Sequence, residues 1–202
     1  MFASTRYPPD PAAADAFLAG MRHGTLIACP PGGHPQVSIL PFVLDGDVIE
    51  LHAVQGDATL DAVRATPHVT FFVSDFLAWS PHRWVDERDG GKATLHFRAV
   101  AMECEVLRVS TDPADVAGAL ARLLAAYEPG ETYEPIEPGD YYGPRLRRLA
   151  TVRLKVVRRH IKFKTGPAGA NDQKRTLVRR LRERAAPGDE RAAEVIESTI
   201  TA

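Results

Sequence analysis

The segment from His52 to Asp57 contains the residues whose spacing best suits chemistry. It joins an apolar run that ends at Val54 to a short helical pattern that begins after Asp57. The first turn of a helix offers unpaired N–H groups and a positive dipole end, so the amides of Gly56 to Ala58 could hold a phosphate. Asp57 is equally suited to cap the helix, and within ~4 Å of a dianion its carboxylate would cost on the order of 1–4 kcal/mol. The sequence leaves both roles open.

Aromatic and imidazole side chains gather on the polar loop WSPHRWVDERDGGK and on the run that follows it. The loop contains Trp79, His82 and Trp84, and His96 lies early in the next run. Such rings could stack on a planar ligand. Packing against a partner subunit explains them equally well.

Motifs of several catalytic and metal-binding classes are missing from the sequence. There is no GxSxG, HExxH or CxxC, and the Gly-rich turn PPGGHP does not open a helix as a dinucleotide site would. The 7 histidines never fall two or four residues apart, and Cys29 and Cys104 are expected to be two buried thiols, neither in a disulfide nor on a metal. We therefore expect no metal site, and no residue stands out as a general acid or base.

Charge and hydropathy give no sign of a polyanionic partner or a membrane. The chain has 202 residues, with 25 Lys and Arg against 26 Asp and Glu. Its N-terminal segment lacks the basic and apolar regions of a signal peptide, and no apolar run could cross a bilayer. We expect a soluble cytoplasmic protein.

The pattern of apolar residues predicts strands and helices that do not alternate regularly. A helix is expected over residues 10–24, a short one over 57–67, another over 113–130 and two in 174–199, separated at Pro187–Gly188. Six strands are expected, over 25–29, 35–44, 48–54, 68–79, 93–110 and 151–166.

These elements predict a mainly β fold with peripheral helices, of the α+β class. Short connections, including the Asp45–Asp47 hairpin turn, favour a six-stranded antiparallel barrel that is closed or nearly closed. We expect one domain over residues 1–168, which includes the N-terminal helix, and a helical tail over 169–202.

The order of the elements resembles the FMN-binding split-barrel superfamily, whose members include pyridoxamine-phosphate-oxidase-like proteins. Within it, the chain is most similar to the PaiB-type group, described as FMN-binding negative transcriptional regulators. The resemblance rests on blocks in the same order along the chain: MFASTRYPPD, LHAVQGDA, WSP with Trp84, ATLHFRAV and IKFKTGPAG.

The resemblance implies FMN as cofactor and a homodimer with the flavin ring at the subunit interface. It implies a split β-barrel of the FMN-binding type, in which the first strand pair lines the ring and the turn after it holds the phosphate. The cofactor-binding residues it implies are Ser38, Ile39, Leu40, Pro41, His52, Ala53, Val54, Gln55, Gly56, Asp57, Trp84, His96, Lys162 and Lys164.

This chain departs from the group at several polar positions. Gln55 and Asp57 stand where the group has Arg and Asn, and Thr94 alone is unchanged in the block P-T-W-N-Y. A phosphate at the turn would therefore need a cation from elsewhere. The candidates are Arg64, Arg83, Arg98, Lys162 and Lys164.

Three functions remain open at this stage. The first is an FMN-binding protein, either an FMN-dependent oxidoreductase or a flavin-linked regulator. The second is a sensing module that has lost FMN or binds another planar ligand such as haem. The third is a transcriptional regulator that contacts DNA, although acidic residues are mixed into the basic tail and nucleic acid is not an expected partner. The basic residues of that tail are Lys174, Arg175, Arg179, Arg180, Arg182 and Arg184.

Overall fold

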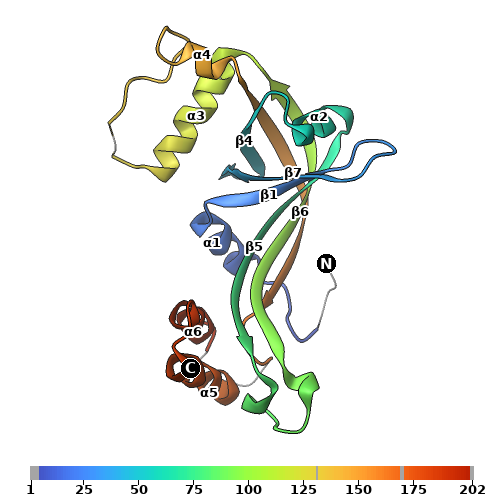
Figure 1. The fold of residues 1–202 in the computed structure, drawn as a ribbon, viewed down its shortest axis with the longest axis vertical. Helices are drawn as coiled ribbons and strands as arrows, with labels where there is room; N and C mark the ends of the chain where they lie inside the picture. The colour runs from blue at the N-terminus through green and yellow to red at the C-terminus, as the bar shows by residue number, and fades with distance from the viewer. Residues whose placement is uncertain (1–4, 131, 169–170, 201–202) are drawn as a thin grey trace. The chain divides into compact units, whose positions relative to one another are not determined.

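The computed structural model describes residues 5–130, 132–168 and 171–200. Its fold is α+β with an antiparallel sheet, as the sequence predicts (Figure 1). The strands are β1 (His23–Ala28), β2 (Gln36–Pro41), β3 (Val43–Asp45), β4 (Val48–Val54), β5 (His68–Ser80), β6 (Thr94–Ser110) and β7 (Leu149–Lys164). The α-helices are α1 (Pro11–Gly20), α2 (Ala58–Ala65), α3 (Pro113–Tyr127), α4 (Gly143–Leu146), α5 (Asn171–Arg184) and α6 (Asp189–Glu197), and two short 3-10 turns are η1 (His82–Trp84) and η2 (Gly90–Lys92).

Over the described residues the sheet has 7 strands in the order β2-β1-β5-β6-β7-β4-β3, so the prediction of six strands is wrong. The expected strand over residues 35–44 is divided at Phe42 into β2 and β3. Phe42 pairs with a side chain instead of a neighbouring strand: its N–H donates to the Tyr127 hydroxyl at 3.1 Å, and that hydroxyl reaches the Phe42 carbonyl at 2.8 Å. The first and last strands of this order, β2 and β3, are thus connected through Phe42. They are not paired with each other by hydrogen bonds in that order, so the described strands do not form a closed barrel.

The chain divides into two compact units. The first, called here the barrel unit, contains residues 12–73 and 101–159, and the second, called the tail unit, contains 1–11, 74–100 and 160–202. Strands β5, β6 and β7 each contribute residues to both. The predicted boundary between barrel and tail falls next to residues 169–170, outside the described part of the chain, and stays a prediction.

Alternating burial along the strands forms the core of the barrel unit. In β4 the side chains of Ile49, Leu51 and Ala53 are buried, and their neighbours along the strand are more exposed. Each large aliphatic side chain removed from water in this way contributes about 1.5–3 kcal/mol. Gly24 is required on β1, because a Cβ there would lie 2.4 Å from the Phe71 ring.

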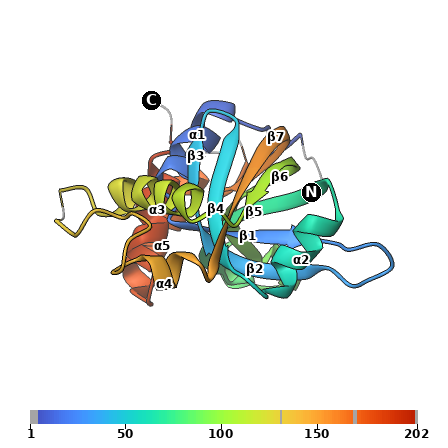
Figure 2. The ribbon, with the colours of Figure 1, turned by 90° about the horizontal axis from the view of Figure 1, so that it is seen from above.

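Helices α2 and α3 both pack against strands of the barrel unit. Helix α2 packs against β1 and β2, and α3 packs against β3 and β4 (Figure 2). Buried Val116 and Ala117 of α3 form a small cluster with Leu146 of α4.

The tail unit has its own apolar core. Leu77 and Ala78 of β5 pack with apolar residues of α5 and α6, namely Leu177, Val178, Leu181, Ala192, Ala193 and Ile196. The prediction of two helices separated at Pro187–Gly188 is confirmed, with Gly188 at a φ of 88°. Across that break the Arg184 guanidinium donates to the Asp189 carboxylate at 2.7 Å. No helix in the described ranges is long and apolar enough to cross a membrane.

Candidate functional site

The residues predicted to bind a cofactor fall into two groups, one in each unit. Ser38 to Pro41 lie on β2, His52 to Val54 at the end of β4, and Gln55 to Asp57 in the turn before α2, all in the barrel unit. Trp84 lies in η1, His96 on β6, and Lys162 and Lys164 at the end of β7, all in the tail unit.

In the barrel unit, Asp57 caps helix α2. Its carboxylate accepts the Thr59 N–H at 2.7 Å, which satisfies one of the N–H groups left open at a helix start. The Ser38 hydroxyl lies 2.8 Å from the Thr59 hydroxyl and 3.4 Å from both Asp57 carboxylate oxygens. The capping interpretation of Asp57 is therefore confirmed.

The backbone amides of Gln55 and Asp57 and the Gln55 side chain are also paired within the chain. The Gln55 N–H donates to the Arg148 carbonyl at 2.8 Å, and the Asp57 N–H donates to the Val54 carbonyl at 3.1 Å. The Gln55 side-chain amide donates to the carbonyls of Arg147 and Leu149 at 2.9 and 3.0 Å. Few donors are left for an anion, so the geometry favours capping over phosphate binding, and the phosphate role stays a prediction.

The tail unit contains a cleft of about 770 Å³, within the size range of cofactor sites. It is bounded by the N-terminal segment, the end of β5, the loop with η1 and η2, the start of β6, the end of β7 and α5. Its lining residues are Arg6, Tyr7, Ser80, Trp84, Val85, Gly91, Lys92, Thr94, His96, Lys164, Gly166, Pro167, Ala168, Asp172, Gln173, Thr176, Leu177 and Arg180.

A buried imidazole lies in the wall of this cleft. His96 is 2% exposed; its Nε2 lies 2.6 Å from Ser80 Oγ, and its Nδ1 accepts the Gly166 N–H at 3.1 Å. Burial, and then the positive charge of Lys164, lower the pKa of His96 to about 4, although the Lys164 backbone acts in the opposite sense. The ring is therefore neutral at physiological pH.

The lining of the cleft carries a net positive charge. Four cationic residues, Arg6, Lys92, Lys164 and Arg180, face one carboxylate, that of Asp172. The Lys164 ammonium donates to the Thr94 hydroxyl, and the pKa of Lys164 is lowered by burial and by the charge of Lys162. Such a lining suits a phosphate or another anionic group.

Comparison with known families decides what the chain is. Residues 1–158 match the family described as "Putative FMN-binding domain". The chain belongs to this FMN-binding family. The predicted resemblance to PaiB-type proteins of the split-barrel superfamily is thereby confirmed.

Solved structures with the same fold include proteins whose names describe them as flavin-binding or haem-binding. The flavocytochrome Anf3 from Azotobacter vinelandii is 20% identical with a TM-score of 0.62, over 83% of this chain and 77% of that one. A FAD and heme binding protein from Mycobacterium smegmatis is 18% identical with a TM-score of 0.61, over 83% of this chain and 78% of that one. A search of curated proteins found no match.

The cleft of this FMN-binding family member brings together sequence blocks that lie far apart along the chain. Ser80 and Trp84 come from the WSP block, Thr94 and His96 from ATLHFRAV, and Lys164 from IKFKTGPAG. Of the predicted tail-unit residues, Trp84, His96 and Lys164 line the cleft. Lys162, two residues before Lys164 on β7, is not among the lining residues.

Sequence reasoning missed several lining residues, among them Ser80, Lys92 and Gly166. Ser80 stands inside the WSP block, so its place in that block was a usable signal. Gly166 contributes a backbone amide to His96, which lies 70 residues earlier in the chain. A contact made by a backbone amide over such a separation cannot be predicted from residue types. Trp84 is held by the Arg184 guanidinium, 4.8 Å from the centre of its ring.

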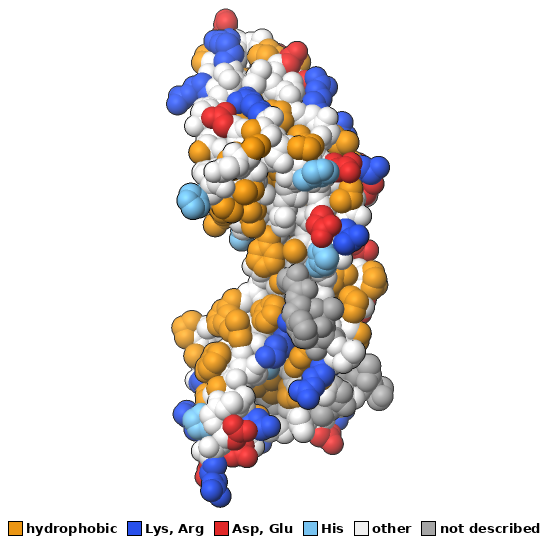
Figure 3. Space-filling model, turned by 90° about the vertical axis from the view of Figure 1, so that its right-hand side faces the viewer, with side chains coloured by type: hydrophobic (Ala, Val, Ile, Leu, Met, Phe, Trp, Pro, Cys, Tyr) orange, Lys and Arg blue, Asp and Glu red, His pale blue; other side chains and the backbone are white. Residues whose placement is uncertain are grey.

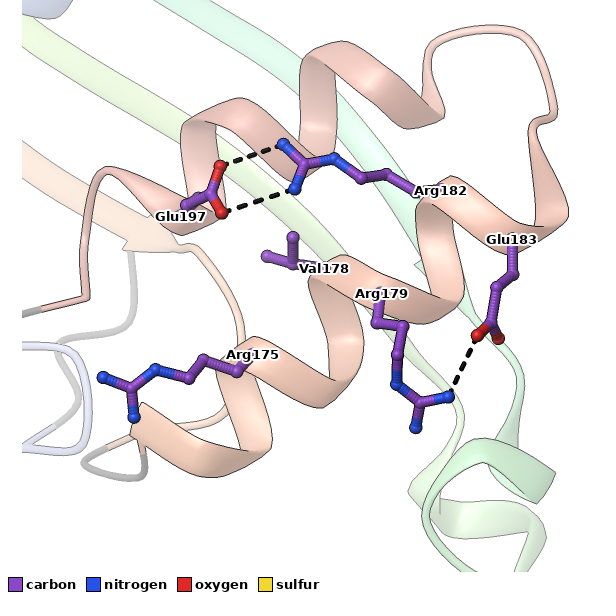
Figure 4. Close-up of a pocket in the computed structure, with 6 residues that line it drawn as sticks. All are labelled: Arg175, Val178, Arg179, Arg182, Glu183 and Glu197. Atoms are coloured by element: carbon purple, nitrogen blue, oxygen red, sulfur yellow. Dashed lines mark hydrogen bonds and ion pairs between the residues drawn. The ribbon is translucent and has the colours of Figure 1, made fainter.

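The basic tail is largely neutralised by its own acidic residues. Arg182 pairs with Glu197 at 2.9 Å and Arg179 pairs with Glu183 at 2.9 Å, in a shallow hollow on α5 and α6 (Figure 4). On the face shown in Figure 3, Lys and Arg side chains are mixed with Asp and Glu instead of forming one continuous patch. No observation here favours nucleic acid as a partner.

Proposed function

We propose that this protein binds FMN in the cleft of the tail unit. The observation that carries the proposal is the convergence there of three blocks of the PaiB-type resemblance, in a chain that belongs to the FMN-binding family. The fit to the cofactor is supported by the size of the cleft, its surplus of cations for a phosphate and the aromatic ring of Trp84.

In this proposal the protein residues bind and orient, and the cofactor supplies redox chemistry. Bound flavin would provide hydride or single-electron transfer. Lys164, fixed by Thr94, would hold the phosphate or another anionic oxygen. His96 is neutral and buried, so it acts as a fixed hydrogen-bonding group. This arrangement suits an FMN-dependent oxidoreductase or a flavin-linked regulator.

Haem is the alternative planar ligand, and the geometry of His96 argues against it. Both ring nitrogens are hydrogen-bonded within the chain, to Ser80 Oγ and to the Gly166 amide. Iron coordination by His96 would require one of these bonds to break. Flavin needs no such ligand, and we therefore favour it.

We also propose a homodimer. The outer face of β2 supports it, because Val37 and Ile39 are 58% and 71% exposed and pair with Ile27 and Thr25 of β1 in an apolar-rich row. The change Ile39→Asp should convert a dimer into a monomer in light scattering after size-exclusion chromatography. A wild-type monomer at micromolar concentration would contradict the dimer.

Absorption spectroscopy of the purified protein tests the proposed cofactor. We expect the two bands of oxidised flavin, or their red shift and fluorescence quenching when FMN is added to colourless protein. A Soret band would indicate haem. Protein that stays colourless and leaves FMN fluorescence unchanged would contradict the proposal.

A further inference from the structure

One buried hydroxyl group in the wall of the cleft makes a single hydrogen bond with the described residues. Ser80 lies at the end of β5, lines the cleft and is 3% exposed. Among the described residues its Oγ makes one hydrogen bond, to His96 Nε2 at 2.6 Å. What this hydroxyl can do depends on which of the two atoms supplies the hydrogen of that bond.

The backbone amide of Gly166 decides the direction of the bond. It donates to His96 Nδ1 at 3.1 Å, so Nδ1 must present a lone pair. A neutral imidazole then carries its hydrogen on Nε2, and Nε2 donates to Ser80 Oγ. The Lys164 backbone favours a ring N–H, but an N–H group on Nδ1 would be directed against the Gly166 N–H, which is unfavourable in a buried wall.

The position of the Gly166 amide is itself fixed. Gly166 has a φ of 91°, a conformation that favours glycine, and a Cβ there would lie 3.2 Å from Lys174 Cγ and 3.3 Å from Ile196 Cγ2. The Tyr7 hydroxyl donates to the Gly166 carbonyl at 3.3 Å. The amide that sets the tautomer is therefore built into the packing of the tail unit.

We infer that Ser80 is a ligand-binding hydrogen-bond donor of the cleft and that His96 is the residue that positions it. Because Oγ already accepts from Nε2, the Ser80 hydrogen is left to point at an acceptor on the ligand. That acceptor would be a carbonyl oxygen or an unprotonated ring nitrogen of a planar heterocycle. This inference rests on the proposed function, since the isoalloxazine ring of FMN carries acceptors of both kinds.

The same geometry separates this role from that of a serine nucleophile. A nucleophilic serine needs an imidazole lone pair to take its proton. In the tautomer fixed by Gly166, Nε2 carries a hydrogen and has no lone pair to offer. His96 can therefore orient the Ser80 hydroxyl but cannot activate it.

Titration with FMN, followed by flavin fluorescence, tests the role of Ser80. The change Ser80→Ala should weaken FMN binding about tenfold and shift the visible band of the bound flavin, because one hydrogen bond to the ring is lost. Ser74→Ala, at an exposed serine of the same strand, should change neither quantity. An unchanged affinity and spectrum in Ser80→Ala would overturn the inference.

Variants of His96 test whether it acts through Ser80. His96→Phe should weaken binding by the same factor as Ser80→Ala, and the double variant should show no further loss. His96→Gln keeps an N–H group close to the Nε2 position and should restore most of the affinity. Additive losses in the double variant would overturn the positioning role.

The nitrogen chemical shifts of His96 in labelled wild-type protein test the tautomer without any ligand. We expect hydrogen on Nε2 and none on Nδ1, whereas hydrogen on Nδ1, directed at the Lys164 backbone, would overturn the inference even if a variant failed to fold. Wild-type protein that does not bind FMN would overturn the proposed function together with this inference. Wild-type protein that binds FMN while Ser80→Ala binds it equally well would overturn this inference alone.

Discussion

The turn before α2 and the cleft of the tail unit hold similar polar groups but use them differently. In the turn, the Asp57 carboxylate, the Gln55 amide and the Ser38 hydroxyl are hydrogen-bonded to other groups of the chain. In the cleft, Ser80 has an unused hydrogen and Lys164 lies in a lining with a surplus of positive charge. Most of the polar side chains of the turn are paired within the chain, whereas the wall of the cleft offers a hydroxyl and a cation to a ligand.

This difference teaches that a helix N-terminus is not sufficient evidence of an anion site. The amides of such a turn bind an anion only where no side chain already occupies them. At α2 the cap is supplied by Asp57, which sits next to the Thr59 amide at 2.7 Å. Changes at His96, Lys164 and Asp57 test this difference between the cleft and the turn.

Acid should destabilise the protein through the cleft. The pKa of His96 is lowered to about 4 from 6.5, so between these pH values the unfolded state binds a proton that the folded state does not. The free energy of unfolding should therefore fall by ~3 kcal/mol as the pH drops through this window, with no contribution from His96 above it. Denaturant unfolding from pH 7 to pH 4 measures this loss.

The matched control for this loss is His96→Gln, which cannot titrate. Its stability should decline less over the same pH window than that of the wild type. Equal declines would mean that His96 is not held neutral, and that the cleft wall is less fixed than its hydrogen bonds indicate.

Removal of the Lys164 charge should weaken FMN binding more than any change in the turn. We expect Lys164→Gln to raise the Kd for FMN about 10- to 100-fold, because a charge-assisted bond to an anionic oxygen is lost. Lys162→Gln, on the same strand but outside the lining, is the control and should have a smaller effect. If both changes raised the Kd for FMN equally, Lys164 would have no special role as a residue that lines the cleft.

The smallest effect is expected at the turn. Asp57→Ala removes the cap of α2 and should lower the free energy of unfolding by about 1 kcal/mol, with no change in FMN affinity. Thermal unfolding and FMN titration of the same variant separate the two quantities. A higher affinity for FMN in Asp57→Ala would show that the turn holds the phosphate, and would reverse the contrast.

Much of the fold was predictable from the sequence because burial periodicity is a local property. Apolar and polar residues alternate in VIELHAV, and Pro and Gly residues mark the turns around each apolar run. These two local patterns predict the order of the elements. The division at Phe42 follows Pro41, a residue that lacks the N–H of a strand ladder and was a usable signal, but the bonds of Phe42 to the Tyr127 hydroxyl, 85 residues away, were not predictable. A local sequence pattern predicts which residues are buried, but it does not predict which distant group takes the place of a strand partner.

The candidate site was predictable only in part, for a related reason. Trp84, His96 and Lys164 could be selected by residue type and by resemblance, and all three line the cleft. The sequence could not show that the side chains of Gln55 and Asp57 form hydrogen bonds within the chain. It also could not show that a backbone amide sets the tautomer of His96.

Strand β5 has a consequence for any attempt to shorten this protein. Its residues belong to both units, and Leu77 and Ala78 near its end are buried against α5 and α6. A chain cut after residue 168 would keep the strand but expose its apolar end, and it would lose the wall of the cleft that α5 supplies. Helices α5 and α6 cover this end of β5, and we expect the smallest soluble fragment to include them.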